Sequence, residues 1–164
     1  MQAGGEFALV KEKLEFALEL SGQPVKRGTM AHRHIIYMML AEAAAQLADV
    51  TALRRYAAQL EKLAIQDDHQ PYLAIAHRAW GIACRLDGDY HDAADRLQKA
   101  LALFEQLETQ WQIGRTLYEI AQLHLAQSNP AGAMEYLSRA LVEFKALGAV
   151  PDIQRTNEAL AMLV

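Results

Sequence analysis

Residues 76–104 read AHRAWGIACRLDGDYHDAADRLQKALALF, and residues 116–144 read TLYEIAQLHLAQSNPAGAMEYLSRALVEF. The two stretches follow one pattern at a spacing of forty residues: a large residue beside a small one, a turn, and an apolar run that ends in phenylalanine. The corresponding positions are Trp80-Gly81 with Ile120-Ala121 and Phe104 with Phe144. Apolar residues at helical spacing on both sides of a turn predict two antiparallel helices in each unit. The chain is therefore predicted to be a helical repeat.

Three columns of residues, each forty apart, extend the pattern beyond these two units. One column suits the N-cap of a second helix, because its side-chain oxygens can accept from free backbone N–H groups. Its members are Asp49, Asp89 and Asn129. The second column is small, with Ala41, Gly81, Ala121 and Ala161, and the third is large, with Leu40, Trp80, Ile120 and Leu160. Small residues beside large ones predict hairpins whose two helices approach closely and bury a core beside the contact.

The columns divide the chain into an N-terminal segment and an array. Residues 1–28 are predicted to hold one helix and a linker rich in turn residues. The helix is interpreted as the second half of a preceding repeat, because KLEFALEL at 13–20 is similar to RLQKALAL at 96–103. The array at 29–164 is predicted to contain repeats 29–68, 69–108 and 109–148 and a terminal helix at 151–164. The predicted fold is all-α, a right-handed superhelical solenoid of antiparallel helix hairpins with about seven to eight helices.

Charge, cysteine content and hydropathy limit the possible partners. A net charge of −4, a pI near 5.8 and the lack of a lysine or arginine cluster argue against direct binding of nucleic acid. The single cysteine, Cys84, excludes an internal disulfide and favours a reducing, cytoplasmic location. No secretory signal is visible, and the longest dense apolar run, 35–41, is far shorter than the ~20 residues that cross a bilayer. No membrane partner is expected.

The sequence contains no motif that would support catalysis. It lacks a phosphate-binding glycine loop with lysine, a GxSxG motif, an HExxH motif and paired cysteines at zinc spacing. The six histidines are scattered, and Cys84 lies in a column that faces the partner helix, where a small core residue is commoner than a nucleophile. We therefore expect no catalytic residue, no bound metal, no cofactor and no enzymatic activity.

These columns resemble the tetratricopeptide repeat, a helix-turn-helix unit of about 34 residues. The resemblance rests on the pair Trp80-Gly81, on the turn Gly88-Asp89-Tyr90, and on alanines in the second helices. Those alanines are Ala93 and Ala133, followed by Ala100-Leu101 and Ala140-Leu141. The unit at 29–68 departs from the family pattern, because Leu53 and Leu60 stand where alanines are expected.

The period of forty residues is longer than the usual repeat and resembles arrays in bacterial signalling proteins. Examples of such proteins are the large ATP-dependent transcription activators and the multidomain ATPases or nucleotide cyclases that end in helical repeats. The resemblance implies a protein–protein interaction module, a scaffold that binds a peptide or a partner protein within a bacterial signalling or regulatory protein. The alternative is a ligand- or peptide-sensing regulatory domain of a transcription activator or cyclase. A sensor would enclose a pocket of several hundred Å³ with convergent polar groups, whereas a scaffold presents an open groove.

The resemblance also implies where a partner would bind, because the first helices of such arrays line a concave side. The predicted face carries Ile35, Met38, Glu42, Ile75, Arg78, Ile82, Arg85, Arg115, Tyr118, Gln122 and Arg155. It begins apolar and becomes rich in arginine, whose planar fork binds a carboxylate at two points, so an acidic peptide is the expected partner. The alternatives are that the arginines only solvate a groove and that the apolar residues are core or dimer contacts. The apolar run at 35–40 also allows a homodimer, unless the helix at 6–20 covers it.

Overall fold

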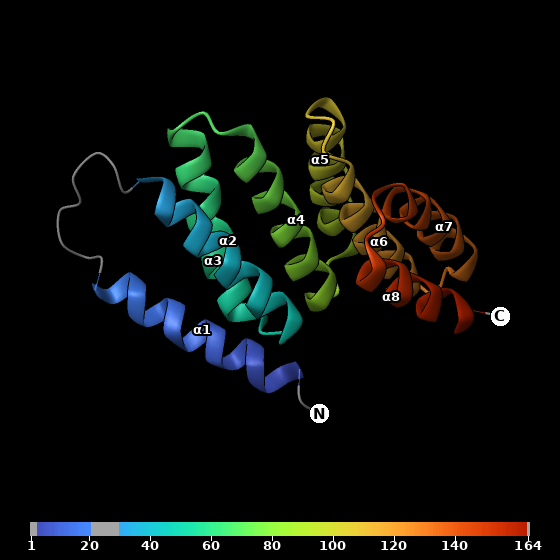
Figure 1. Ribbon diagram of the computed structural model, residues 1–164, viewed down its shortest axis with the longest axis horizontal. Coiled ribbons are helices and arrows are strands. Elements are labelled where there is room, and N and C mark those ends of the chain that lie inside the picture. Colours follow the sequence, from blue (N-terminus) through green and yellow to red (C-terminus); the bar gives the residue numbers. More distant parts are fainter. Residues whose placement is uncertain (1–2, 21–29, 164) are drawn as a thin grey trace.

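A computed structural model describes residues 3–20 and 30–163 of the chain. Within these residues the chain forms eight helices and no strand. They are α1 (Ala3–Leu20), α2 (Met30–Gln46), α3 (Val50–Gln66), α4 (Gln70–Asp87), α5 (Tyr90–Gln106), α6 (Gln110–Ala126), α7 (Pro130–Leu147) and α8 (Val150–Ala161). Consecutive helices pack on one another along the chain (Figure 1), which confirms the predicted all-α solenoid of helix hairpins. The predicted linker lies outside the described residues, and the division into domains stays a prediction.

The turns repeat as regularly as the helices. From α2 onward, each described turn holds one residue with positive φ, and these residues recur at a spacing of forty. Within the hairpins they are Ala48, Gly88 and Ser128, and between the hairpins they are Asp68, Glu108 and Gly148. Glycine adopts this left-handed conformation without the steric cost that a Cβ atom brings, and this explains its use at 88 and 148.

The predicted N-cap column is confirmed. Asp49 Oδ1 accepts from the backbone N–H of Ala52 at 3.0 Å, and Asp89 Oδ1 accepts from Asp92 at 3.3 Å. Asn129 Oδ1 accepts in the same way from Gly132 at 3.0 Å. Each bond satisfies one backbone donor that the first turn of a helix leaves free, so these three side chains define where α3, α5 and α7 begin.

The column of small residues forms the close contact inside three hairpins. Ala41, Gly81 and Ala121 are all buried, and a Cβ atom added to Gly81 would lie 2.6 Å from Leu97 Cγ and 2.8 Å from Leu97 Cδ2. The fourth member, Ala161, is exposed because no helix among the described residues follows α8. The expectation of a close contact at Ala161 was therefore wrong.

Residues 29–68 depart from the family pattern because large and small side chains exchange positions in the core of this repeat. In α5 the core positions are small, large and small, with Ala93, Leu97 and Ala100. In α3 the equivalent positions are large, small and large, with Leu53, Ala57 and Leu60. All six side chains are fully buried, with exposures of 0%. Exchanging large and small residues between neighbouring positions keeps the total core volume, and cores tolerate such swaps.

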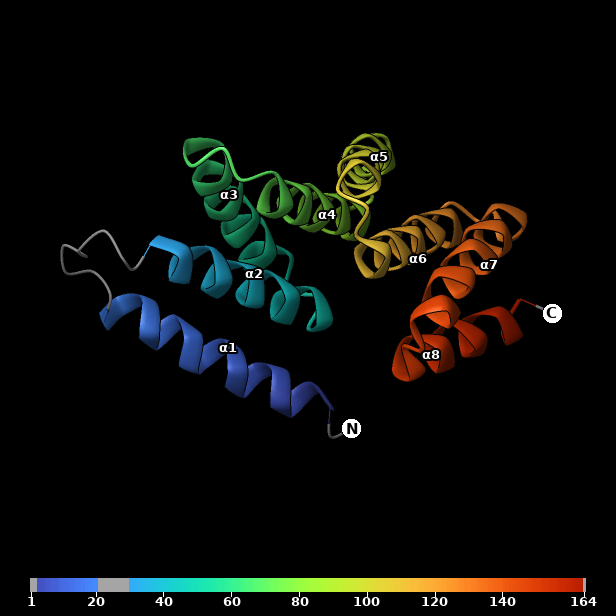
Figure 2. The same cartoon turned by 45° about the horizontal axis from the view of Figure 1, so that its top comes forward.

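The array curves with the first helix of each hairpin on the inside. Besides the contacts within hairpins, α2 packs against α4 and α4 packs against α6. Figure 2 shows α2, α4, α6 and α8 along the inner side of the curve and α3, α5 and α7 along the outer side. At the N-terminal end, α1 packs against α2, and its Leu14 and Leu18 contact the core that includes Leu40 and Leu53. No described helix has both the length and the apolar character needed to cross a membrane.

Candidate functional site

The inner helices bring the predicted partner-binding residues onto one side of the array, but at very different depths. Ile75, Arg78 and Ile82 are buried, with exposures of 6%, 2% and 8%. Ile35 is exposed, and Met38, Tyr118 and Gln122 are half-buried. The side chains of Arg85 and Arg115 are each 18% exposed, and that of Arg155 is 37% exposed. A partner on this side would therefore contact mainly the two ends of the predicted set, on α2 and on α6 to α8.

Glu42 on α2 holds two of the predicted arginines. Its Oε1 accepts from Arg78 Nη2 of α4 at 3.1 Å and from Arg115 Nη1 of α6 at 3.1 Å, and its Oε2 accepts from Arg115 Nη2. Arg78 Nη1 also donates to Gln112 Oε1 at 2.7 Å. Three successive inner helices are thus joined by one carboxylate, in the two-point geometry that favours arginine over lysine. This Glu42 bridge occupies the guanidinium groups that were expected to receive a partner's carboxylate.

The charges of the bridge shift one another's pKa values. Burial by itself would raise the pKa of the Glu42 carboxyl, but the positive charges of Arg78 and Arg115 outweigh it and lower that pKa below its ordinary value. Burial lowers the pKa of the Arg78 guanidinium to about 10, and the like charge of Arg115 acts in the same direction. For Arg115 burial acts downward, yet the adjacent Glu42 raises its pKa. All three groups are charged at neutral pH, so the bridge is an ion triad with one net positive charge.

The remaining arginines of the inner side also have carboxylate partners. Arg85 Nη2 lies 3.2 Å from Glu119 Oε2, and Arg155 Nη2 lies 3.5 Å from Asp152 Oδ1. Four arginines are therefore balanced by three carboxylates, and the inner side is much less basic than the arginine content of the sequence suggested. The Arg155 contact is the longest of these pairs, and its side chain is the most exposed.

Two aromatic side chains of α6 accompany these arginines. The guanidinium carbon of Arg155 lies 4.1 Å from the ring centre of Tyr118, and that of Arg115 lies 4.8 Å from the ring of Trp111. Trp111 is 43% exposed, and its Nε1 donates to Asp152 Oδ2 at 3.1 Å. Sequence reasoning missed Trp111 as a site residue. Its position in the repeat could have identified it. Pro71 and Pro151 lie forty residues before and after Trp111, so a tryptophan stands where the other repeats begin a helix with proline.

The depression beside the Glu42 bridge is small. It is lined by Glu42, Ile75 and Arg78 among others, and it encloses only about 10 Å³. A larger pocket of about 540 Å³ lies elsewhere, where α1, α2 and α3 meet. Within the described part of the chain, no three His, Cys, Asp or Glu side chains are grouped so that they could hold a metal ion. Burial raises the pKa of the buried Cys84 thiol, the opposite of what activates a nucleophile.

Comparison with known proteins agrees with the repeat pattern. Residues 72–141, from α4 into α7, match the family model of the tetratricopeptide repeat. No curated protein matches the chain. Tetratricopeptide repeats are generally protein–protein interaction modules that bind protein partners, and the family is generally not enzymatic. The match covers residues 72–141, and the hairpins, caps and close contacts of that stretch support its assignment to the tetratricopeptide repeat family.

Proposed function

We propose that the chain is a non-enzymatic scaffold that binds a peptide segment of a partner protein on its inner side. The observation that carries this proposal is the cluster formed by Trp111, Arg115, Tyr118 and Arg155 on α6 and α8. Tryptophan, tyrosine and arginine are the residue types that dominate binding energy at protein interfaces. Here they lie together and partly exposed on the inner helices, the side where the family resemblance implies the partner.

The chemistry of the partner follows from which groups remain accessible. Arg78 is fully engaged inside the chain, so a partner's carboxylate is expected to approach Arg155, with Arg115 at its edge. At the other end of the inner side, Ile35 and Met38 offer apolar contacts. The proposed partner segment therefore has an apolar side chain toward α2 and a carboxylate toward α8. It is only modestly acidic, because Glu42, Glu119 and Asp152 already neutralise most of the arginine charge.

The proposed setting is a cytoplasmic bacterial signalling or regulatory protein. The support is the forty-residue period, which resembles the long repeats of such arrays, and the single buried Cys84, which suits a reducing compartment.

Charge reversal on the inner side tests the binding proposal. Peptides selected from a displayed random library against the folded chain are expected to bind Arg155→Glu about thirtyfold or more weakly, since truncating a hot-spot residue costs at least about 2 kcal/mol. Ile35→Ser should weaken the same peptides through the apolar contact. Fluorescence anisotropy with labelled peptides measures both effects.

Arg139 on α7 supplies the matched control for this experiment. It also places its guanidinium over a tyrosine ring, 5.2 Å from the centre of Tyr136, but it lies on an outer helix and is exposed. Arg139→Glu should leave peptide affinity unchanged. Equal binding to the native chain and to Arg155→Glu, or a loss of binding with Arg139→Glu, would contradict an inner-side partner.

A homodimer through the apolar run of α2 stays a prediction with a direct test. Leu40 is a fully buried core residue, whereas Ile35 and Met39 on the same helix are 42% and 41% exposed. If two copies pair through these side chains, light scattering at high concentration should give twice the 18.3 kDa of one chain. Met39→Glu should then return the mass to one chain. A single-chain mass for the native protein would contradict the dimer.

A further inference from the structure

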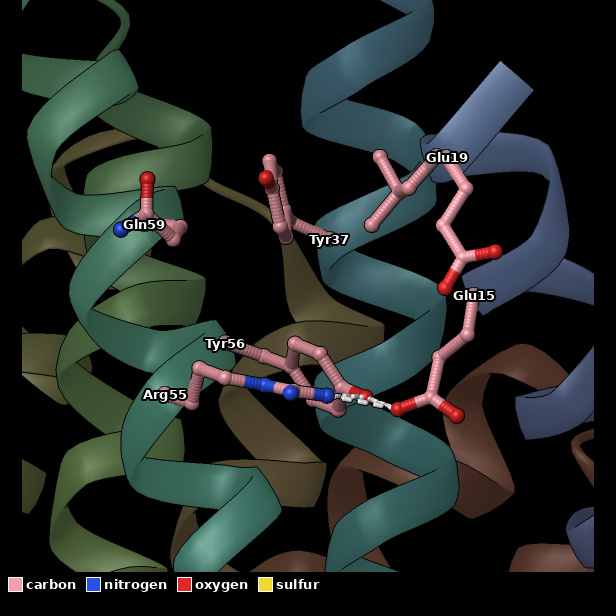
Figure 3. Close-up of a pocket in the computed structure, with 7 residues that line it drawn as sticks. Glu15, Glu19, Tyr37, Arg55, Tyr56 and Gln59 are labelled. Carbon is pink, nitrogen blue, oxygen red and sulfur yellow. Dashed lines mark hydrogen bonds and ion pairs between the residues drawn. The ribbon is translucent and has the colours of Figure 1, made fainter. Parts of the chain in front are cut away.

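The largest cavity described above, about 540 Å³, lies between α1 and α3 and over α2, away from the inner face that α4, α6 and α8 continue. It is lined by Glu15, Leu18, Glu19, Tyr37, Arg55, Tyr56 and Gln59. Figure 3 shows the two glutamates on one wall, Gln59 on the opposite wall, and Tyr37 between them. None of these residues belongs to the proposed partner site on the inner side, so the pocket is a separate feature.

One wall of the pocket is internally satisfied. Arg55 Nη2 lies 2.6 Å from Glu15 Oε1, and the Tyr56 hydroxyl donates to the same oxygen (Figure 3). The guanidinium of Arg55 also lies over the Tyr56 ring, 4.7 Å from its centre. Burial raises the pKa of Tyr56 to about 12, and the bond to Glu15 acts in the same direction, so the phenol keeps its proton. Arg55 and Glu15 therefore neutralise each other.

Two groups in the pocket have no charged partner among the described residues. The Glu19 carboxylate makes no hydrogen bond or ion pair with any described residue. The Tyr37 ring lies 6.5 Å from the Tyr56 ring and, among the described arginines and lysines, none lies over its face. Among the described residues, an exposed carboxylate without an ion pair therefore lies beside an aromatic face that no cation covers, and this combination attracts an organic cation.

The next repeat shows what fills the equivalent place. The forty-residue period pairs Tyr37 with His77 and Tyr56 with Arg96. The similarity of 13–20 to 96–103 pairs Leu18 with Leu101, and the period then pairs Leu101 with Glu61.

At that second position the chain supplies its own cation. Arg96 Nη1 lies 2.5 Å from Glu61 Oε1 and 3.0 Å from His77 Nδ1. A guanidinium thus bridges the preceding outer helix and the inner helix beneath it. In the first repeat tyrosine replaces this arginine and leucine replaces this glutamate, while Glu19 places a carboxylate one residue further along α1.

We infer that the pocket between α1, α2 and α3 binds an external guanidinium or ammonium group on an alkyl stem, in the place that Arg96 fills in the next repeat. The carboxylate of Glu19 pairs with the cation, the Tyr37 ring covers it, and Leu18 contacts the stem. The source is either a free small molecule or an arginine or lysine side chain of a protein. This site is separate from the proposed inner-side partner site, and each can fail without the other.

Two neutral-backbone probes test the charge requirement. N-acetyl-arginine amide carries the cation and no free carboxylate, and N-acetyl-citrulline amide has nearly the same shape without the charge. In an NMR titration of the full chain, the arginine probe should shift the backbone amides of Tyr37, Tyr56 and Glu19 in a saturable way. The citrulline probe should bind at least about tenfold more weakly, because a charge-assisted hydrogen bond contributes about 1.5–3 kcal/mol. Equal binding of the two probes would overturn the inference.

Variants then locate the site. Glu19→Gln is expected to weaken the arginine probe about tenfold. Tyr37→Leu, which keeps an apolar side chain but removes the ring, should weaken it about threefold. The matched control is Glu6→Gln on the same helix, where Glu6 is exposed and outside the pocket, and it should leave affinity unchanged. If Glu19→Gln binds like the native chain while its circular dichroism is unchanged, the inference is wrong.

A third arm separates the two sources of the cation. A blocked pentapeptide with arginine between alanines should bind no more tightly than the single-residue probe if the ligand is a small molecule. Tighter binding of the pentapeptide, still dependent on Glu19, would indicate a protein side chain. Loss of the Glu19 dependence in both arms would remove the site.

Discussion

Replacing Glu42 by glutamine is expected to lower the free energy of unfolding by about 3 kcal/mol, because it leaves buried arginine charge without its counterion. The Arg78 side chain is only 2% exposed, and Glu42 is its carboxylate partner. Without that partner, the positive charges of Arg78 and Arg115 repel each other across the contact between α4 and α6. Glutamine keeps the shape of the side chain, so the loss reports on charge. Urea denaturation followed by circular dichroism measures it.

Two further variants show whether the loss belongs to the bridge. Adding Arg78→Met to Glu42→Gln removes the stranded charge and should recover about 2 kcal/mol, since apolar replacements of buried ion pairs are often neutral. Glu119→Gln removes the carboxylate that pairs with Arg85, whose side chain is 18% exposed against 2% for Arg78. Water can therefore solvate the charge left on Arg85, and the loss should be at most about half that of Glu42→Gln. If Glu42→Gln and Glu119→Gln lower the free energy of unfolding by similar amounts, the Glu42 bridge stabilises the fold no more than an ordinary ion pair.

The same bridge predicts an acid dependence with a definite sign. The pKa of Glu42 is lower in the folded chain than its ordinary value of 4.5. An acid with a depressed folded pKa stabilises the fold fully above its unfolded pKa, and this contribution is lost as pH falls through the folded pKa. The native chain should therefore lose more stability than Glu42→Gln when the pH is lowered from neutral to below 4.5.

The fold could be predicted because its determinants are local and recur. The N-caps Asp49, Asp89 and Asn129 and the close contact at Gly81 each act within one hairpin, and the period of forty makes each visible several times. Even the departure at Leu53 and Leu60 was visible in the sequence. That Ala57 compensates for the two leucines could be seen only in the structure, because only the three-dimensional packing shows that these neighbouring positions share one volume.

For the candidate site, the sequence could predict only which side of the inner helices carries it. Helical periodicity identifies which residues of an inner helix turn away from its partner helix, and this placed Glu42, Arg78 and Arg115 on one side. It does not say which charges meet. Glu42 and Arg115 are 73 residues apart and come together only because α2, α4 and α6 follow one another along the curve. The sequence therefore suggested free arginines, where the fold neutralises them internally.

The pocket beneath α1 was beyond sequence reasoning for a similar reason. The inference compares Tyr56 and Leu18 with Arg96 and Glu61 at the equivalent positions of the next repeat. That comparison needs the placement of α1 against α2 and α3, and the ion pair of Lys11 with Asp49 at 2.5 Å is part of what positions α1.

Gly81→Leu is expected to lower the free energy of unfolding by about 3 kcal/mol or more through overpacking. The Cβ atom alone would lie 2.6 Å from Leu97 Cγ and 3.2 Å from the Ala93 carbonyl oxygen, so α4 and α5 must separate to admit the side chain. Gly81→Ala should cost about 1 kcal/mol, because the Leu97 side chain must move and the Ala93 carbonyl must shift slightly, while alanine favours the helix. The next repeat supports this smaller loss of stability for Gly81→Ala, because Ala121 is already buried at the equivalent position.

The control for this series is Gly5→Leu on α1, where an added Cβ atom meets nothing within 4 Å. Leucine favours a helix over glycine by up to about 1 kcal/mol, so this variant should hold or raise the unfolding free energy. Opposite signs for the same substitution at Gly81 and Gly5 separate the packing penalty from helix propensity. If Gly81→Leu unfolds at the native urea concentration, the hairpin does not depend on that contact, and the column of small residues that defines the repeat has lost its physical basis.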